Sequence, residues 1–259
     1  MTAPATPYTP AELRARIRQG LLPGITSGYA PGYLQANLVV LPNELAADFR
    51  LYCERNPQPC PLIEQLAPGD PEPKRSAPGA DLRQDISRYR VFRYGEAAEE
   101  PVNILHLWDE GLTAFLLGCS FGFEHSLVRV GIPMRHQETG APAPTYVTGV
   151  ETTPAGVFNG PLVVTMRPVA DDKLALAAEV SGAVPLSHGA PVHVGDPAAL
   201  GIDDLDRPDY GDPVEVRPGE TPVYWACGVT PQAVAERVRL PLVITHSVGH
   251  MFITDLPAA

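Results

Sequence analysis

The stretch Val223-Tyr-Trp-Ala-Cys-Gly-Val-Thr-Pro231 shows the pattern on which the fold is built. Its first half is rich in β-branched and aromatic residues, which predicts a buried strand. Gly228 then breaks the strand, and Thr230 with Pro231 opens a helix that we expect to reach about residue 238.

A strand followed by a glycine turn and a helix leaves free backbone N–H groups at the helix N-terminus, and such groups bind anions. Open α/β sheets place ligands at this end of their strands. We therefore predict that Gly228, Thr230 and the preceding Cys227 belong to a substrate site. The alternative is a purely structural turn, with Cys227 as a packed core thiol rather than a stabilised thiolate.

Gly118-Cys-Ser-Phe-Gly-Phe-Glu124 predicts a second turn of this kind, and the residues before it, 112–117, are expected to form a short helix. Ser120 can cap a following helix that runs to about Val130, and the N-terminus of that helix could hold a substrate carboxylate. Glu124 lies one turn into the helix and is a candidate acid or base. The alternatives are a cap without a further role for Ser120 and an exposed helical side chain for Glu124.

The remaining elements have weaker signals. Thr9, Pro10 and Glu12 form the signature of a capped first helix, which Gly20 ends. The pattern also predicts helices over 43–55 and 171–181, and strands over 34–41, 89–94, 146–150, 162–167, 191–194 and 242–245. The proline-rich segment 57–80 predicts an ordered loop, either a surface connection or the wall of a pocket.

Together these elements predict a mixed α/β (α+β) fold. We expect a larger α/β sandwich domain made from residues 1–129 and 187–259. Residues 130–186 are expected to form a smaller inserted β–β–α domain.

Composition excludes several classes of protein. The 259-residue chain is 44% hydrophobic, enough for a sizeable core, and its net charge of −11 makes nucleic acid an improbable partner. The sequence has no apolar stretch long enough to cross a membrane and no secretory signal pattern. Its four cysteines form no CxxC pair. Together these features predict a cytoplasmic protein with reduced thiols. Only two lysines and dispersed cysteines argue against pyridoxal phosphate and iron–sulfur clusters, so we expect no cofactor.

The histidines and two arginines are the other candidates for chemistry. His193 and Asp196 lie close together in the sequence, and His246 and His250 flank a glycine. Two histidines spaced i, i+4 share a metal when they lie on a helix, but the residues around this pair favour strands and a turn, so we expect no metal. Acid–base or structural roles are the alternatives. Arg135 and Arg167 could each bind a carboxylate, or form structural ion pairs.

Several separate motifs resemble one family. They include Gly28-Tyr-Ala-Pro-Gly-Tyr-Leu-Gln-Ala-Asn37, Arg55-Asn-Pro-Gln-Pro-Cys-Pro-Leu62, Gly118-Cys-Ser-Phe121, Gly160-Pro-Leu-Val-Val-Thr-Met-Arg-Pro168, Gly189-Ala-Pro-Val-His-Val-Gly-Asp-Pro197 and Trp225-Ala-Cys-Gly-Val-Thr-Pro-Gln232. The series resembles the hydro-lyase family that includes D-glutamate cyclase, over about residues 10–255. The resemblance implies a two-domain α/β fold and reversible removal of water, with D-glutamate cyclising to 5-oxo-D-proline as the best-defined activity. It carries over no catalytic residue.

Cyclisation of glutamate needs a base for the ammonium, donors for the oxyanion, an acid for the departing hydroxide and an anchor for the α-carboxylate. We assign the base to His193 or His246, with Asp196 orienting a histidine. The backbone near Gly228–Thr230 would supply donors, and Arg167 the anchor.

The complete hypothesis combines these roles at a single site. Its catalytic group is His193, Asp196, His246 and Glu124, and its substrate-binding group is Ser120, Arg135, Arg167, Cys227, Gly228, Thr230 and His250. The expected partner is a small carboxylate or amino acid, and a homo-oligomer stays open. The alternatives are a dehydratase of a different hydroxy acid and a non-catalytic protein that binds a small carboxylate.

Overall fold

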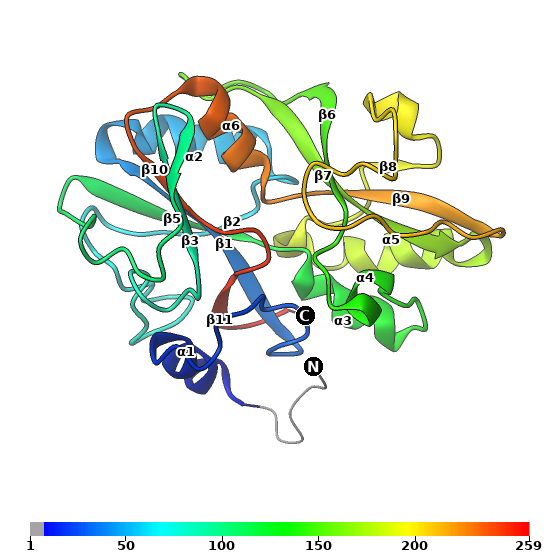
Figure 1. Cartoon of the computed structure of the whole chain (residues 1–259), viewed down its shortest axis with the longest axis horizontal. Coiled ribbons are helices and arrows are strands. Elements are labelled where there is room, and N and C mark those ends of the chain that lie inside the picture. The colour runs from blue at the N-terminus through cyan, green and yellow to red at the C-terminus, as the bar shows by residue number, and fades with distance from the viewer. Residues whose placement is uncertain (1–7, 259) are drawn as a thin grey trace.

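The computed structural model describes residues 8–258 and consists of two antiparallel sheets with helices packed on them. Figure 1 shows sheet A in the left half of the molecule and sheet B in the right half. In order across the sheet, sheet A contains β2 (Leu62–Gln65), β5 (Leu112–Gly118), β1 (Tyr33–Pro42), β10 (Val243–His246), β3 (Tyr89–Arg93) and β4 (Glu96–Glu99), and β11 (Phe252–Pro257) pairs with β1. The predicted mixed α/β fold is confirmed.

Sheet B contains, in order, β6 (Thr145–Glu151), β7 (Pro161–Ala170), β9 (Glu220–Ala226) and β8 (His193–Val194). One of its faces carries Trp225 and Val169, which join the core beneath α3 (Phe121–Arg129) and α5 (Leu174–Gly182). The other face carries Tyr224 and Met166, which form a separate apolar cluster. Because side chains alternate along a strand, neighbouring residues of β7 and β9 belong to different environments.

The remaining helices are α1 (Pro10–Arg18), α2 (Ala46–Arg55), α4 (Arg135–Thr139) and α6 (Thr230–Val238), and short 3₁₀ turns are η1 (Asn43–Leu45), η2 (Asp171–Lys173), η3 (Pro185–Ser187) and η4 (Pro197–Leu200). The predicted capping box of α1 is confirmed, since the Thr9 side chain accepts from the Glu12 N–H and the Glu12 carboxylate accepts from the Thr9 N–H. Among the described residues, no helix is long and apolar enough to cross a membrane.

The predicted helix over 112–117 is wrong, because these residues form β5, a central strand of sheet A. All seven residues of β5 are buried, so the alternation of buried and exposed residues that identifies a half-exposed strand is missing. The prediction also missed β2, β4 and α4, whereas the strand tendency of the residues after His250 is confirmed by β11.

Sheet B extends past the predicted insertion. Residues 130–186 contain β6, β7 and α5, but β8 and β9 belong to the same sheet and lie after residue 186. The division into two domains stays a prediction. Since every strand pairing is antiparallel, the argument from the carboxyl ends of a parallel sheet does not apply to this fold.

Sheet A forks along one edge of β1. On this edge, Val39 and Val40 pair with β10, whereas Ala36 pairs with β11. The connecting loop, residues 247–251, leaves the sheet between the two strands. The fork therefore interrupts the strand ladder at Asn37 and Leu38, and Figure 1 shows β10 and β11 on either side of this point along β1.

Candidate active site

Two strand-to-helix turns have the same local construction. In the first, β5 passes through Cys119 and Ser120 into α3, and in the second, β9 passes through Cys227 and Gly228 into α6. We call them the paired turns, residues 118–121 and 227–230. In each, the cysteine sulfur accepts a hydrogen bond from the backbone N–H two residues later, and the Val229 N to Cys227 Sγ distance is 3.5 Å.

The predicted helix cap at Ser120 is wrong. Its side chain makes no capping hydrogen bond to α3, and its backbone already has helical dihedral angles. The Ser120 hydroxyl instead accepts from Nη2 of Arg167 at 3.0 Å. The hydroxyl is therefore turned from its own helix toward sheet B.

The Asn37 side chain touches both turns. Its Nδ2 donates to the Gly118 carbonyl at 2.6 Å. A Cβ atom at residue 228 would lie 1.9 Å from the same Nδ2, which is closer than any real contact, so a larger residue here would displace the Asn37 side chain. Asn37 is buried and lies beside the fork in sheet A, so the fork and the paired turns form one region.

Each turn leaves one backbone donor unused. Within residues 8–258, no hydrogen bond is formed by the backbone N–H of Ser120 or of Gly228. Thr230 differs from the prediction, because its N–H donates to the Cys227 carbonyl at 3.0 Å. Of the predicted donors near Gly228–Thr230, Gly228 is therefore the one that remains for a ligand, and Ser120 supplies a second from the other turn.

The sulfur atoms of the turns are thiols near neutral pH. Burial raises the pKa of Cys227 to about 11 and that of Cys119 to about 12. A thiol is a poor nucleophile, so the turns offer hydrogen-bond donors rather than a thiolate.

A buried ion pair supports the first turn. Arg167 on β7 is almost fully buried and donates to Glu124 Oε1 through Nε at 3.1 Å and to Thr165 Oγ1 through Nη1 at 2.9 Å. Gln137 and His136 also contact the Glu124 carboxylate. The predicted anchor role of Arg167 stays a prediction, but its donors are already occupied by protein groups.

Glu124 is held as a carboxylate. Burial opposes its ionisation, but the charges of Arg167 and His136 and their hydrogen bonds outweigh burial and lower the pKa of Glu124 to about 2. A group with so low a pKa does not exchange protons near neutral pH. The structure therefore favours a positioning role for Glu124 over the predicted acid–base role.

His246 lies at the fork and is held as a neutral imidazole. Burial lowers its pKa to about 4. The Leu38 N–H donates to Nδ1 at 3.2 Å, so the ring proton must lie on Nε2. The Nε2 atom is buried and has no hydrogen-bond partner among the described residues. Gln232 donates to the His246 carbonyl at 2.9 Å and ties this residue to the first turn of α6.

This tautomer changes the role of His246. An Nε2–H group donates a hydrogen bond and cannot accept a proton, so the predicted base function does not fit the geometry. A neutral imidazole donor instead suits a developing oxyanion. Its fixed N–H is the third unused donor of the site, after those of Ser120 and Gly228.

His250 lies in the loop of the fork and is half-buried. Its Nδ1 is 2.8 Å from Ser87 Oγ. Burial and the charge of Arg88 lower the pKa of His250, and the charge on His250 in turn affects His246. The two histidines therefore belong to the same electrostatic environment.

His193 and Asp196 lie elsewhere. His193 on β8 pairs with Tyr224 of β9 and shares its face of sheet B, whereas Arg167 pairs with Val223 and faces the opposite side. The His193 Nε2 is 2.8 Å from the backbone carbonyl of Asp196, and the Asp196 carboxylate accepts from the Ala198 N–H at 3.0 Å. The predicted single site stays a prediction: His246 is tied to the helix that Thr230 opens, whereas His193 lies on the face of sheet B opposite Arg167.

Arg135 also lies outside the paired turns. It forms a two-pronged ion pair with Glu220, with Nη1 to Oε2 at 2.9 Å and Nη2 to Oε1 at 2.6 Å. This pair joins α4 to the start of β9, which is a structural role. Among residues 8–258, no group of three or more metal-binding side chains is close enough to hold an ion.

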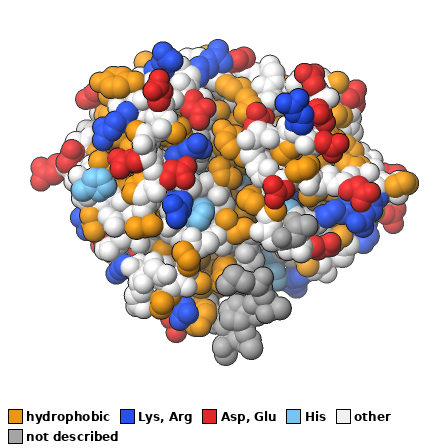
Figure 2. Space-filling view, in the orientation of Figure 1, with side chains coloured by type: hydrophobic (Ala, Val, Ile, Leu, Met, Phe, Trp, Pro, Cys, Tyr) orange, Lys and Arg blue, Asp and Glu red, His pale blue; other side chains and the backbone are white. Residues whose placement is uncertain are grey.

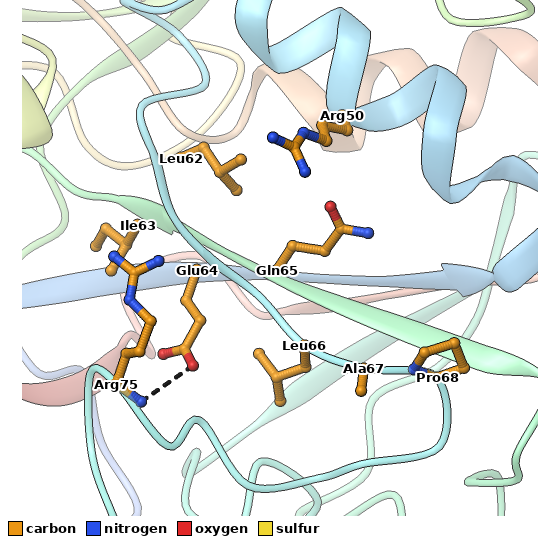
Figure 3. Close-up of a pocket in the computed structure, with 9 residues that line it drawn as sticks. All are labelled: Arg50, Leu62, Ile63, Glu64, Gln65, Leu66, Ala67, Pro68 and Arg75. Carbon is orange, nitrogen blue, oxygen red and sulfur yellow. Dashed lines mark hydrogen bonds between the residues drawn. The ribbon is translucent and has the colours of Figure 1, made fainter.

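Part of the proline-rich segment lines a surface pocket of about 480 Å³ beside the edge strand β2. Figure 3 shows Arg50 of α2 above it and Glu64 beside Arg75. Glu64 accepts from the backbone N–H groups of Arg75 at 3.1 Å and Ser76 at 2.9 Å, so its carboxylate is occupied. The predicted pocket wall exists, but its residues are not those of the paired turns.

Sequence reasoning missed Asn37, Ser87 and Gln232. A buried asparagine inside the apolar strand β1 was the available signal for the first, because buried polar groups need a partner. Ser87 and Gln232 act through residues more than ten positions away, and local patterns do not show such contacts.

Figure 2 shows hydrophobic side chains gathered between the two halves of the molecule, on the face drawn.

Comparison with known proteins agrees with the motif resemblance. The family described as D-glutamate cyclase matches residues 113–255, which include both paired turns, His246 and His250. A "Putative hydro-lyase" of Stutzerimonas stutzeri is 55% identical over 248 residues, covering 96% of this chain and 94% of the relative. A protein of Rubrobacter xylanophilus with the same name is 57% identical over 245 residues, covering 95% of each chain.

One solved structure, a nitrogen repressor-like protein from Methanococcus jannaschii, is similar over 95% of this chain and 98% of its own, with a TM-score of 0.39 and 9% identity. That likeness is too weak to support an argument about fold or function. The matches in sequence are strong and cover nearly the whole chain. On this evidence the chain belongs to the D-glutamate cyclase family.

Proposed function

We propose that the chain is a hydro-lyase acting on a small amino acid or carboxylate, and that its leading substrate is D-glutamate, cyclised to 5-oxo-D-proline. The observation that carries this proposal is the set of unused donors around Asn37. The backbone N–H groups of Ser120 and Gly228 and the Nε2–H of His246 all lack partners among the described residues. The family membership supplies the reaction class.

Unused buried donors suit this chemistry. When an amine attacks a carboxyl carbon, negative charge develops on oxygen, and fixed donors in a water-poor site stabilise that charge. Removing one such donor from an acyl-transfer enzyme typically costs about 10²–10³-fold in rate. His246 is suited to this task because a neutral donor does not lose its proton at the pH at which the substrate amine reacts.

The anionic substrate must be attracted locally, because the chain has a net charge of −11. The N-termini of α3 and α6 supply partial positive charge without a side-chain cap. In this proposal one N-terminus holds the α-carboxylate while the other faces the reacting carboxyl group. Positioning both ends of one molecule favours ring closure, since the reaction is intramolecular.

The test is to incubate the purified protein with D- and L-glutamate, other amino acids and hydroxy acids, and to detect loss of one water by mass spectrometry. The proposal expects a cyclic product from D-glutamate. Dehydration of a hydroxy acid alone would support a hydro-lyase with a different substrate. Binding without turnover for every compound would favour a non-catalytic carboxylate-binding protein and would refute the proposal.

A further inference from the structure

We infer that His250 is the general base of this site and that Ser87 is the residue that positions it. The inference rests on the proposed function, since it names the group that moves protons in that reaction. It replaces His193 and His246, the residues that the sequence had favoured for this role. Its basis is a short chain of hydrogen bonds that fixes where the proton sits on the His250 ring.

The hydrogen-bond chain begins at a backbone carbonyl. Ser87 Oγ is 3.1 Å from the Gly24 carbonyl, which can only accept, so the hydroxyl hydrogen points there. Ser87 Oγ is also 2.8 Å from Nδ1 of His250. A hydroxyl has one hydrogen, so both contacts are satisfied together only when Nδ1 donates to Ser87. The lone pair of His250 is then on Nε2, the nitrogen that can accept a proton.

The backbone around His250 is held from several sides. The Ser247 N–H donates to the Arg88 carbonyl at 2.9 Å, and Ser247 Oγ donates to the Tyr89 carbonyl at 3.0 Å. On the other side, the Thr26 N–H donates to the Gly249 carbonyl at 2.8 Å. The loop is therefore fixed to β3 and to the segment before β1, and the ring orientation is set by the fold rather than by a ligand.

The two histidines of the fork have complementary tautomers. His246 receives a backbone N–H on Nδ1 and carries its proton on Nε2, whereas His250 gives its Nδ1 proton to Ser87 and leaves Nε2 free. One ring is thus a donor and the other an acceptor at the equivalent atom. A condensation that creates an oxyanion and moves a proton needs one group of each kind.

Burial, together with the charge of Arg88, favours the neutral form of His250. Burial is the largest influence and lowers its pKa, Arg88 lowers it further, and Glu100 raises it. A charge on His250 would in turn lower the pKa of His246. The net direction is downward, so the ring is neutral and able to accept a proton above its lowered pKa.

The proton balance of the reaction is complete with this one base. Nε2 of His250 takes a proton from the substrate ammonium, and the amine lone pair then forms the C–N bond with the side-chain carboxyl carbon. His250 returns that proton to a carboxyl oxygen and then carries a second proton from the new C–N nitrogen to the same oxygen. The C–O bond breaks and water leaves, so both protons of the water come from the substrate nitrogen and no oxidant or further reactant is needed.

Matched variants separate the base from its positioning residue. His250→Asn keeps an amide N–H where Nδ1 donates to Ser87 but removes Nε2, and we expect kcat to fall by about 10²-fold or more. Ser87→Ala leaves the base but frees its tautomer, so we expect a smaller loss and a changed acid limb of the pH profile. Ser87→Thr keeps the hydroxyl and should restore most of the activity.

Nitrogen-15 NMR of histidine-labelled protein checks the tautomers without turnover. The expected spectrum has a protonated Nδ1 and an unprotonated Nε2 for His250, and the reverse for His246, with each signal assigned from the corresponding variant. If wild-type protein dehydrates no compound in the panel, the proposed function fails. If wild-type protein is active, the inference is overturned by a His250→Asn variant with kcat within about threefold of wild type, or by a protonated Nε2 on His250.

Discussion

Replacing Arg167 by Met should destabilise the protein strongly, because it leaves Glu124 as a buried charge without its main partner. The Arg167 and Glu124 side chains are each 2% exposed. Breaking a buried pair by removing one partner costs about 3–5 kcal/mol. For a chain of this size, that corresponds to a fall of roughly 6–20 °C in melting temperature.

The lowered pKa of Glu124 reflects the net effect of burial and of its partners Arg167 and His136. Its folded value is about 2, against an ordinary value of 4.5. Because the folded pKa is lower, the carboxylate contributes stability above the unfolded pKa, and this contribution is lost as the pH falls toward 2. A difference of this size is worth about 3 kcal/mol, which agrees with the mutational range.

The assay is urea unfolding followed by tryptophan fluorescence, at pH 7 and at several values down to pH 3. The gap between wild type and Arg167→Met should be largest at pH 7 and should narrow as the pH falls and Glu124 takes up a proton in the variant before it does so in wild type. The double variant Arg167→Met/Glu124→Leu removes both charges and should be more stable than Arg167→Met alone. Arg237→Met is the control, since its pair with Glu151 is exposed and should contribute less than about 1 kcal/mol.

Two results would refute this reasoning. The first is an Arg167→Met variant that loses less than about 1 kcal/mol, which is the range of an exposed pair. The second is a gap between wild type and variant that does not change with pH. Either would mean that the buried ion pair does not hold the first turn against sheet B.

Three further predictions follow from the site. Gly228→Ala should lower kcat/KM at least tenfold, because the new Cβ would meet the Asn37 side chain at 1.9 Å. Circular dichroism should still show a folded protein, and an unchanged kcat/KM would contradict the close approach. His193→Ala should keep activity within about threefold of wild type, since His193 lies on the Tyr224 face of sheet B, away from the paired turns. A hundredfold loss in steady-state assays would show that His193 belongs to the active site. Dialysis against EDTA should leave activity unchanged, because no group of three or more metal-binding side chains occurs among residues 8–258. Loss of activity on dialysis and its recovery with an added metal ion would contradict this prediction.

Much of the fold could be predicted where the signal is local. The strand before Gly228 and the helix after Thr230 were predicted close to their observed bounds, because turn residues and a change of periodicity mark them. The strand β5 was mistaken for a helix since a strand buried on both faces shows no alternation. Its assignment depends on neighbours in β1 and β2 that are distant in the sequence.

The candidate site could be predicted only in part, for a similar reason. Both turns were identified, because each has its own glycine or serine signal. The register that puts His193 beside Tyr224, on the face opposite Arg167, is a property of the assembled sheet. The tautomer of His246 depends on the Leu38 N–H, 208 positions earlier in the chain, so no local pattern indicates that this histidine is a donor.

The most direct test of the proposed site compares two substitutions of His246 in the conversion of D-glutamate to 5-oxo-D-proline, followed by chiral chromatography. His246→Gln places an amide N–H near the position of Nε2–H, whereas His246→Asn can accept from Leu38 but has no donor there. We predict product with wild type, a partial loss of rate with His246→Gln, and a loss of about 10²-fold or more with His246→Asn. No product from wild-type protein at a concentration comparable to the substrate, or equal rates for the two variants, would contradict it.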